Sequence, residues 1–391
     1  ETAGLTFDEW KYSDDYEAIM KEFTNYQYEV RFLRAYFYFE LIKRYRNIPF
    51  VLYVLAQNEA NGVNPESYEK IAKFIVDECS DLAQILPVNY DNFSTKEKGR
   101  VTRAAAMALK SRVTLYMASP LFSEDSEDKW KQAAEAAYDI IKQKTDLGLD
   151  LVPYPQIFND VNNQKAEVIL YRPTGESGDF EKANFPIGVE GGKTSTCPTQ
   201  NLMEAYDMKD GTPFVNPYDN RDPRMKYTIV CNEMKWPVDP VEIWEGGTNG
   251  LPLQNATTTG YYLKKYVNNT ISFEAGSTVT KKQHNWVLFR YGEILLNYAE
   301  AMINAFHDPN YKDAVYNMSA REAVNQIRGR TNISLPGFPS DITEKDFVKR
   351  LKNERRVELA FEGHRFWDVR RWKELGQTAN IYGVKITKNN E

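Results

Sequence analysis

The stretch ERRVELAFEGHRFWDVRRW, from Glu354 to Trp372, places acidic, basic and large aromatic residues side by side. An amphipathic surface helix separates its charged residues from its apolar ones, and this stretch does not. Glu354, Glu358 and Glu362 fall four residues apart, so a continuous helix would present them on one face. The mixture indicates charged packing inside a fold rather than a solvated helix face.

The arginines of the same stretch can neutralise these glutamates; they are Arg355, Arg356, Arg365, Arg370 and Arg371. Gly363 permits a break between two helices, because glycine adopts backbone conformations that other residues avoid. We predict an ion-paired helical hairpin in which Trp367 and Arg371 stack as a cation–π pair. The alternative is a pair of catalytic carboxylates acting on a glycoside, which would face each other across a cleft. Consecutive turns of one helix hold them side by side instead.

The 391-residue chain has the composition of an ordinary globular protein, with 42% hydrophobic and 27% charged residues. Its net charge is −6, so it lacks the positive field that phosphate backbones select, and we expect no nucleic-acid partner. Its apolar runs are interrupted by charges before they reach transmembrane length. For the widely spaced Cys79, Cys197 and Cys231 we expect free thiols, with a Cys197–Cys231 disulfide as the alternative.

Hydrophobic periodicity predicts four helical hairpins along the chain. The expected pairs are Met20–Tyr45 with Ser67–Leu86, Thr102–Ala118 with Trp130–Lys144, Phe289–Ala305 with Tyr316–Arg330, and Glu344–Phe361 with His364–Leu375. Alanines beside large residues in the helices that open the second and third pairs allow close helix packing. Repeated pairs of this kind predict a mainly α fold built as a tetratricopeptide-like array, with an irregular all-α domain as the alternative.

The composition of the sequence changes between residues 145 and 285, where Pro, Gly, Asn and Thr become frequent. Short apolar runs at Glu167–Tyr171 and Lys226–Cys231 predict strands. We therefore expect a single domain over residues 1–391, with a helical scaffold at 20–144 and 286–376. The loop-rich insertion at 145–285 is the expected ligand-binding part, because loops on a rigid scaffold commonly carry recognition.

Aromatic residues in this insertion stand among amides, carboxylates and glycines, which is the pattern of a sugar site. A flat ring packs on the C–H face of a pyranose, while its hydroxyl groups bond to the polar neighbours. The residues that we predict to contact a ligand are Tyr206, Tyr218, Trp236 and Trp244. The alternative for each ring is that it fills a small core beneath the loops. Tyr261 and Tyr262, in a strand-like segment, are expected to pack.

No motif of nucleotide binding or nucleophilic hydrolysis occurs, since GxSxG, GxxxxGK[ST] and GxGxxG are all absent from the sequence. His364 and Asp368 have the spacing of two metal ligands on one helix, but no third ligand is suggested nearby. His284 and His307 are isolated. We therefore expect no catalytic residues, no cofactor and no metal site.

Several segments together resemble the SusD/RagB family, in the expected order from about Tyr28 to Trp372. Besides the opening stretch, they are EVRFLRAYFYFELIKRYRNIPFV, RAAAMALKSRVTLYMASP, DPRMKYTI, TGYYLKKYV and FRYGEILLNYAEAMINA. The resemblance implies a mainly α fold of four tetratricopeptide-like units with an irregular ligand-binding part. Arg46 departs from the family, because a glycine is usual before the Asn-Ile-Pro turn.

The resemblance also implies a function as a binding protein, not an enzyme. Such proteins are lipid-anchored at the surface of the outer membrane in Bacteroidetes and deliver oligosaccharides to a SusC-like TonB-dependent transporter. The first residues, ETAGLTFDEW, do not read as a signal peptide, so we expect a processed or truncated chain whose lipid anchor lies outside it. Two alternatives remain: an oligopeptide-binding protein of the RagB type, and a helical-repeat scaffold for other proteins without a small ligand.

Overall fold

A computed structural model of the chain describes residues 16–93, 97–124, 126–209, 216–236, 239–274 and 280–388. The expectation about the ten opening residues lies outside this part. The helices are α1 (Tyr16–Tyr45), α2 (Tyr68–Ile85), α3 (Arg103–Ala118), α4 (Glu127–Lys142), α5 (Asp179–Asn184), α6 (Gln200–Ala205), α7 (Met225–Thr228), α8 (Tyr291–Phe306), α9 (Ala320–Arg328), α10 (Glu344–Glu358) and α11 (Arg365–Arg371). The strands are β1 (Ile48–Pro49), β2 (Pro65–Glu66), β3 (Val168–Pro173), β4 (Ile229–Val230), β5 (Tyr262–Leu263) and β6 (Asn285–Arg290).

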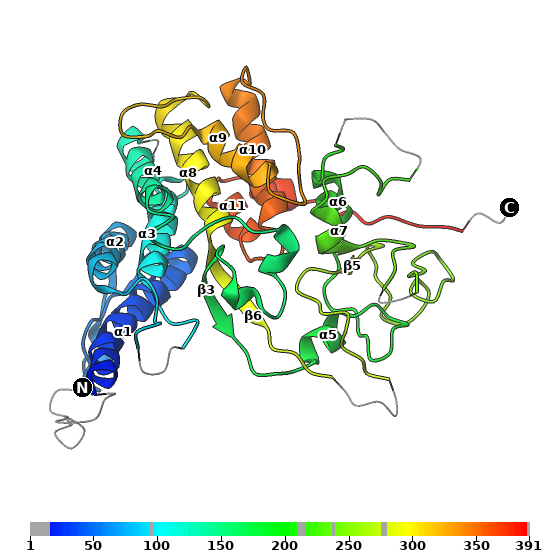
Figure 1. Cartoon of the computed structure of the whole chain (residues 1–391), viewed down its shortest axis with the longest axis horizontal. Coiled ribbons are helices and arrows are strands. Elements are labelled where there is room, and N and C mark those ends of the chain that lie inside the picture. Colours follow the sequence, from blue (N-terminus) through cyan, green and yellow to red (C-terminus); the bar gives the residue numbers. More distant parts are fainter. Residues whose placement is uncertain are drawn as a thin grey trace.

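The long helices form one continuous stack on one side of the molecule (Figure 1). Each of α1, α2, α3 and α4 packs on the next, α8 then packs on α4, and α9 and α10 pack on α8. One hydrophobic core runs through this stack. Alanines on α3, such as Ala105 and Ala108, are fully buried and let neighbouring helices approach closely. The prediction of a mainly α, tetratricopeptide-like array is confirmed.

Capping side chains account for several of the helix starts. Ser67, Ser126 and Thr343 each accept a hydrogen bond from a backbone N–H in the first turn of α2, α4 and α10. Ser319 forms a full capping box with Glu322 at the start of α9. These short polar residues occupy positions where a helix leaves its first N–H groups without partners.

Arg46 ends α1 in the left-handed region, with φ of 63°. Its N–H donates to the carbonyl of Ile42 at 2.9 Å, which closes the last turn. Glycine adopts this conformation without steric cost, which gives a physical reason for the glycine that the resemblance implies at this position.

Two predicted elements around the insertion need correction. The helix expected from Phe289 begins at Tyr291, because residues 285–290 form β6, which pairs antiparallel with β3. The strand expected at Lys226–Cys231 is helical at first, as α7, and extended only in β4. Arg224 initiates that turn, because its N–H donates to Asp222 and its carbonyl accepts from the Thr228 hydroxyl at 2.9 Å.

The segment between α4 and β6 forms an irregular lobe beside the helical stack (Figure 1). Its short elements enclose small hydrophobic clusters, one around Tyr206 and Met225 and another around Trp236 and Tyr262. The division of a single domain into scaffold 20–144 with 286–376 and insertion 145–285 stays a prediction.

The described helices are each too short or too polar to cross a lipid bilayer. Cys79, Cys197 and Cys231 are free thiols, which confirms the expectation of unpaired cysteines; Cys197 is only half-buried.

Candidate functional site

The glutamates of the opening stretch lie inside the molecule, bound to arginines. Glu358 is fully buried and contacts Arg290 Nη1 at 2.8 Å, Arg224 Nη1 at 2.8 Å and Arg330 Nη2 at 3.0 Å. Burial opposes its ionisation, but the charges of Arg330, Arg290 and Arg224 outweigh burial and hold the pKa of Glu358 well below its usual range. The arginines of the stretch itself do not neutralise Glu358, which corrects that part of the prediction.

This buried ion network balances its charges and joins the lobe to the scaffold. Its cations are Arg224, Lys265, Arg290, Arg328 and Arg330, and its anions are Glu167, Asp222, Glu354, Glu358 and Glu362. Five positive and five negative side chains meet where α10, β6 and the insertion come together. A carboxylate enclosed in this way does not reach a substrate, so the geometry does not support the glycosidase alternative built on these glutamates.

A second cluster anchors α11 to α8. Glu300 accepts hydrogen bonds from Arg371 and from the indole N–H of Trp372, at 2.7 Å for the indole, and Arg371 also pairs with Asp368 at 2.8 Å. Burial opposes the ionisation of Glu300, but the charge and hydrogen bond of Arg371, the charge of Arg355 and the hydrogen bond of Trp372 together outweigh burial and lower its pKa to about 2. Arg355 joins this cluster at 3.3 Å from Asp368.

The predicted stack of Trp367 and Arg371 is replaced by other pairs. The guanidinium of Arg371 lies 4.8 Å from the ring centroid of Trp372. Trp367 is instead contacted by the ammonium of Lys43 at 4.7 Å and by Arg44 at 5.0 Å, both at the end of α1. The physical reason is that Arg371 points inward, toward Glu300, while Trp367 faces α1.

Two of the four predicted ligand aromatics are buried, which corrects the expectation that they present a ring to solvent. Tyr206 is 0% exposed and packs with Met203, Met225 and Ile229. Trp236 is 3% exposed and lies edge-on to Phe185. Both rings fill the small cores under the loops, which is the alternative given for each ring in the sequence analysis.

Tyr218 is half-buried at the border of the same core. Its ring meets that of Tyr261 edge-to-face, with centroids 6.2 Å apart. Tyr261 and Tyr262 are buried in packing roles, as expected. Part of the Tyr218 side chain is therefore used in packing.

Trp244 is the predicted aromatic residue that lies in a hollow. It is half-buried and lines a depression of about 620 Å³ with Glu233, Asp239, Pro240, Glu242 and Thr248. The ammonium of Lys388 lies 4.7 Å from its ring centroid. Three carboxylates beside one indole ring offer acceptors for hydroxyl groups and a flat apolar surface.

Glycines hold the loop that carries Trp244. The N–H of Gly247 donates to the carbonyl of Trp244 at 2.9 Å, and the amide of Asn249 fixes the backbone of Glu242 at 2.8 Å. A Cβ on Gly247 would lie 2.4 Å from the carbonyl oxygen of Glu242, and one on Gly250 would lie 2.2 Å from that of Trp244. No side chain fits at either position, so the sequence WEGGTNG shapes this loop.

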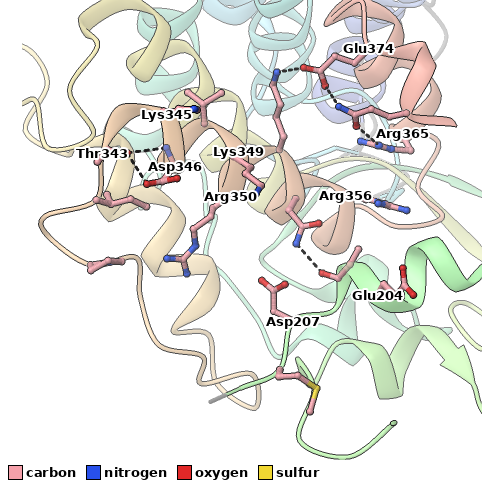
Figure 2. A pocket seen from close by; sticks show the side chains of 18 of the residues that line it. Glu204, Asp207, Thr343, Lys345, Asp346, Lys349, Arg350, Arg356, Arg365 and Glu374 are labelled. Carbon is pink, nitrogen blue, oxygen red and sulfur yellow. Dashed lines mark hydrogen bonds and ion pairs between the residues drawn. The ribbon is translucent and has the colours of Figure 1, made fainter. Parts of the chain in front are cut away.

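A larger groove, which sequence reasoning missed, lies between α10 and the segment after α6 (Figure 2). It has a volume of about 1200 Å³ and carries charges of both signs. Asp207 faces Arg350 across it, while Lys345 and Lys349 project from α10 and Arg356 and Arg365 lie at its other end. The alternating charges of α10 in the sequence gave no indication that one face would border a groove.

Among the described residues, no group of three or more His, Cys, Asp and Glu side chains is arranged to hold a metal ion. His364 is half-buried, and burial followed by the charge of Arg112 lowers its pKa well below the usual range. Asp368 is bound to Arg371 and Arg355. The carboxylate of Asp368 is therefore bound by arginines rather than free for a metal ion.

Comparison with known proteins identifies the family. A sequence model described as the SusD family matches residues 157–391, which is more than half of the chain. Two curated relatives from Formosa agariphila, SusD-like protein P2 and SusD-like protein P38, are each 23% identical to the chain. The matches cover 92% and 88% of this chain, and 67% and 66% of those proteins. The chain thus spans about two thirds of their length.

Solved structures show the same arrangement. A SusD-like carbohydrate-binding protein from Bacteroides fragilis is 28% identical with a TM-score of 0.75, over 91% of this chain and 69% of that one. A second SusD-like protein from the same species is 27% identical with a TM-score of 0.74, over 92% and 71% of the two chains. This helical stack with its irregular lobe is the fold of a SusD-like protein. The chain belongs to the SusD family.

Proposed function

We propose that this protein binds oligosaccharides and that Trp244 contacts them. Three observations support this: the family, the similarity to a SusD-like carbohydrate-binding protein, and an indole ring in a hollow lined by carboxylates. The last of these carries the proposal, because it belongs to this chain. Glu233, Asp239 and Glu242 accept hydrogen bonds from sugar hydroxyls while the ring packs on the C–H face. An oligopeptide would require sheet edges and side-chain pockets instead.

Calorimetric titration with a panel of host and plant oligosaccharides tests this proposal. We expect at least one ligand to bind, and Trp244→Ala to weaken it at least tenfold, about 1.4 kcal/mol. Trp244→Phe should retain most of the affinity, because it keeps an apolar ring. Trp367→Ala is the matched control, since Trp367 is also half-buried but lies against α1, and it should leave binding unchanged.

Two results would count against the proposal. If no oligosaccharide of the panel bound, the proposal that the ligand is a glycan would be contradicted. Binding that Trp244→Ala leaves intact would move the ligand to another surface.

The same proposal includes delivery to a SusC-like TonB-dependent transporter from the outer-membrane surface, with attachment through a lipid anchor. Outer-membrane lipoproteins are typical of the family. Stable association of this kind requires on the order of 1,200–2,000 Å² of buried surface. Affinity purification of the protein from its native membrane should recover a β-barrel transporter; recovery of a soluble partner alone would favour the protein-scaffold alternative.

A further inference from the structure

An apolar cleft of about 410 Å³ adjoins the charged groove. Three segments build it: Cys197–Leu202, Ala360–Phe366 and Gln377–Ile381. Its walls are largely apolar, and two of the side chains, Phe366 and Ile381, are 58% and 71% exposed. A mainly apolar concavity of this size with a few convergent polar groups is the usual form of a small-ligand site.

Two arginines stand at the border between the cleft and the groove, since Arg356 and Arg365 line both. Each is half-buried. Arg356 donates to the carbonyl of Asn201 at 2.6 Å, and Arg365 donates to the side-chain oxygen of Gln377 at 3.2 Å. Both partners are neutral. Within the described ranges, no carboxylate oxygen lies within 4.0 Å of either guanidinium.

The acids whose charges act on these arginines have partners of their own. Glu374 forms an ion pair at 2.5 Å, Asp368 is held in the buried cluster, and Glu204 accepts a hydrogen bond at 3.1 Å. Their partners are Lys352, Arg371 and Gln200, respectively. Lys352 and Arg371 neutralise Glu374 and Asp368, whereas the neutral Gln200 leaves the charge of Glu204 in place. Two guanidinium groups beside one such carboxylate leave net positive charge at the border for water or for a ligand.

The energetics of the two guanidinium groups agree with this arrangement. Burial and then the charge of Arg365 lower the pKa of Arg356, and burial also lowers the pKa of Arg365. An anion bound between them would relieve both penalties. His364 also lines the cleft, and burial followed by the charge of Arg112 holds its pKa well below the usual range, so the two arginines supply the positive charge.

We propose that this cleft binds an organic acid, with the carboxylate on Arg356 and Arg365 and an apolar body against Phe361 and Phe366. Guanidinium groups bind carboxylates through charge-assisted hydrogen bonds of matching planar geometry. Acidic side chains of the adjoining groove, such as Asp207 and Glu204, disfavour a polyanion, so the ligand carries a single charge. This cleft shares no lining residue with the Trp244 hollow, so the two proposals succeed or fail separately.

The test compares 3-phenylpropionate with its neutral amide, 3-phenylpropionamide, by calorimetry or ligand-observed NMR at low salt. The acid should bind at least tenfold more tightly than the amide. Arg356→Gln combined with Arg365→Gln should abolish that difference. Arg350→Gln is the matched control: it is another half-buried arginine of α10 without an ion pair, but it lines only the groove and packs 4.1 Å from the Phe338 ring centroid. It should leave binding of the acid unchanged.

Further measurements separate the parts of the proposal. Phe366→Ala should weaken binding of the acid severalfold, although it leaves the charge of the cleft unchanged. If octanoate binds and its affinity depends on the same two arginines, the result supports the site and shows that it accepts a ligand with an aliphatic body. Equal affinity of acid and amide for the unmodified protein, or absence of binding by both acids, overturns the proposal, and neither result depends on a variant that must fold.

Discussion

Arg355 and Arg356 are neighbours in the sequence and lie in opposite environments. Arg355 is 1% exposed and bonds to Asn297 at 2.8 Å and to Asp368. Arg356 is half-buried, with a backbone carbonyl as its partner. An enclosed charge requires an opposite charge because it has lost its water, whereas a half-exposed one does not. The inner face of the Glu354–Trp372 stretch therefore stabilises the fold, and its outer face is open to a ligand.

The largest expected effect lies on the inner face. Glu358→Gln removes the negative charge shared by Arg224, Arg290 and Arg330, so we expect a loss of about 3–5 kcal/mol in the free energy of unfolding. Chemical denaturation followed by circular dichroism measures this loss. Glu374→Gln is the control, because Glu374 pairs with Lys352 near the surface. This substitution should lower the free energy of unfolding by about 1 kcal/mol or less.

Equal losses from Glu358→Gln and Glu374→Gln would contradict the assignment of Glu358 to a structural network. The glycosidase alternative predicts the reverse pattern: sugar release by the unmodified protein that Glu358→Gln abolishes while stability is unchanged.

An effect of intermediate size is expected on the stability of the protein at acidic pH. The pKa of Glu300 falls from an ordinary 4.5 to about 2 in the folded protein, since burial is outweighed by Arg371, Arg355 and Trp372 acting together. A depressed carboxyl pKa contributes stability that is present above pH 4.5 and lost as the pH falls toward 2. At about 1.4 kcal/mol per pKa unit, this contribution is about 3 kcal/mol. Glu300→Gln should therefore show a shallower loss of unfolding free energy between pH 4.5 and 2.

The measurement is a series of urea titrations at several pH values for both proteins. If the free energy of unfolding fell with pH at the same rate in the unmodified protein and in Glu300→Gln between pH 4.5 and 2, Glu300 would not be the carboxyl that Arg371 stabilises.

The scaffold could be predicted from the sequence because its signals are local. Alternating small and large residues predicted α3 and α8, and Gly363 does adopt a positive φ of 77° between α10 and α11. The partners of Glu358 could not be predicted. Arg224, Arg290 and Arg330 are separated from it by 28 to 134 positions, and periodicity contains no information on such distant pairs.

The site was harder to predict for a related reason. Tyr206, Trp236 and Trp244 all stand near acidic residues in the sequence, yet the first two lie in small cores and the third lines a hollow. Which ring is covered depends on packing between loops. The WEGGTNG loop offered one usable signal, because Gly247 and Gly250 mark where the backbone approaches itself too closely for a side chain.

The smallest expected effect lies on the outer face. Arg356→Gln removes a cation that has no carboxylate partner and keeps a donor for the carbonyl of Asn201, so we expect the free energy of unfolding to change by about 0.5 kcal/mol or less. Arg355→Gln at the adjacent position should cost several-fold more, because it leaves Asp368 short of a partner. Denaturation of the two variants side by side measures the contrast. A similar loss for both would mean that Arg356 also supports the fold, and its availability to an organic acid would then have no basis.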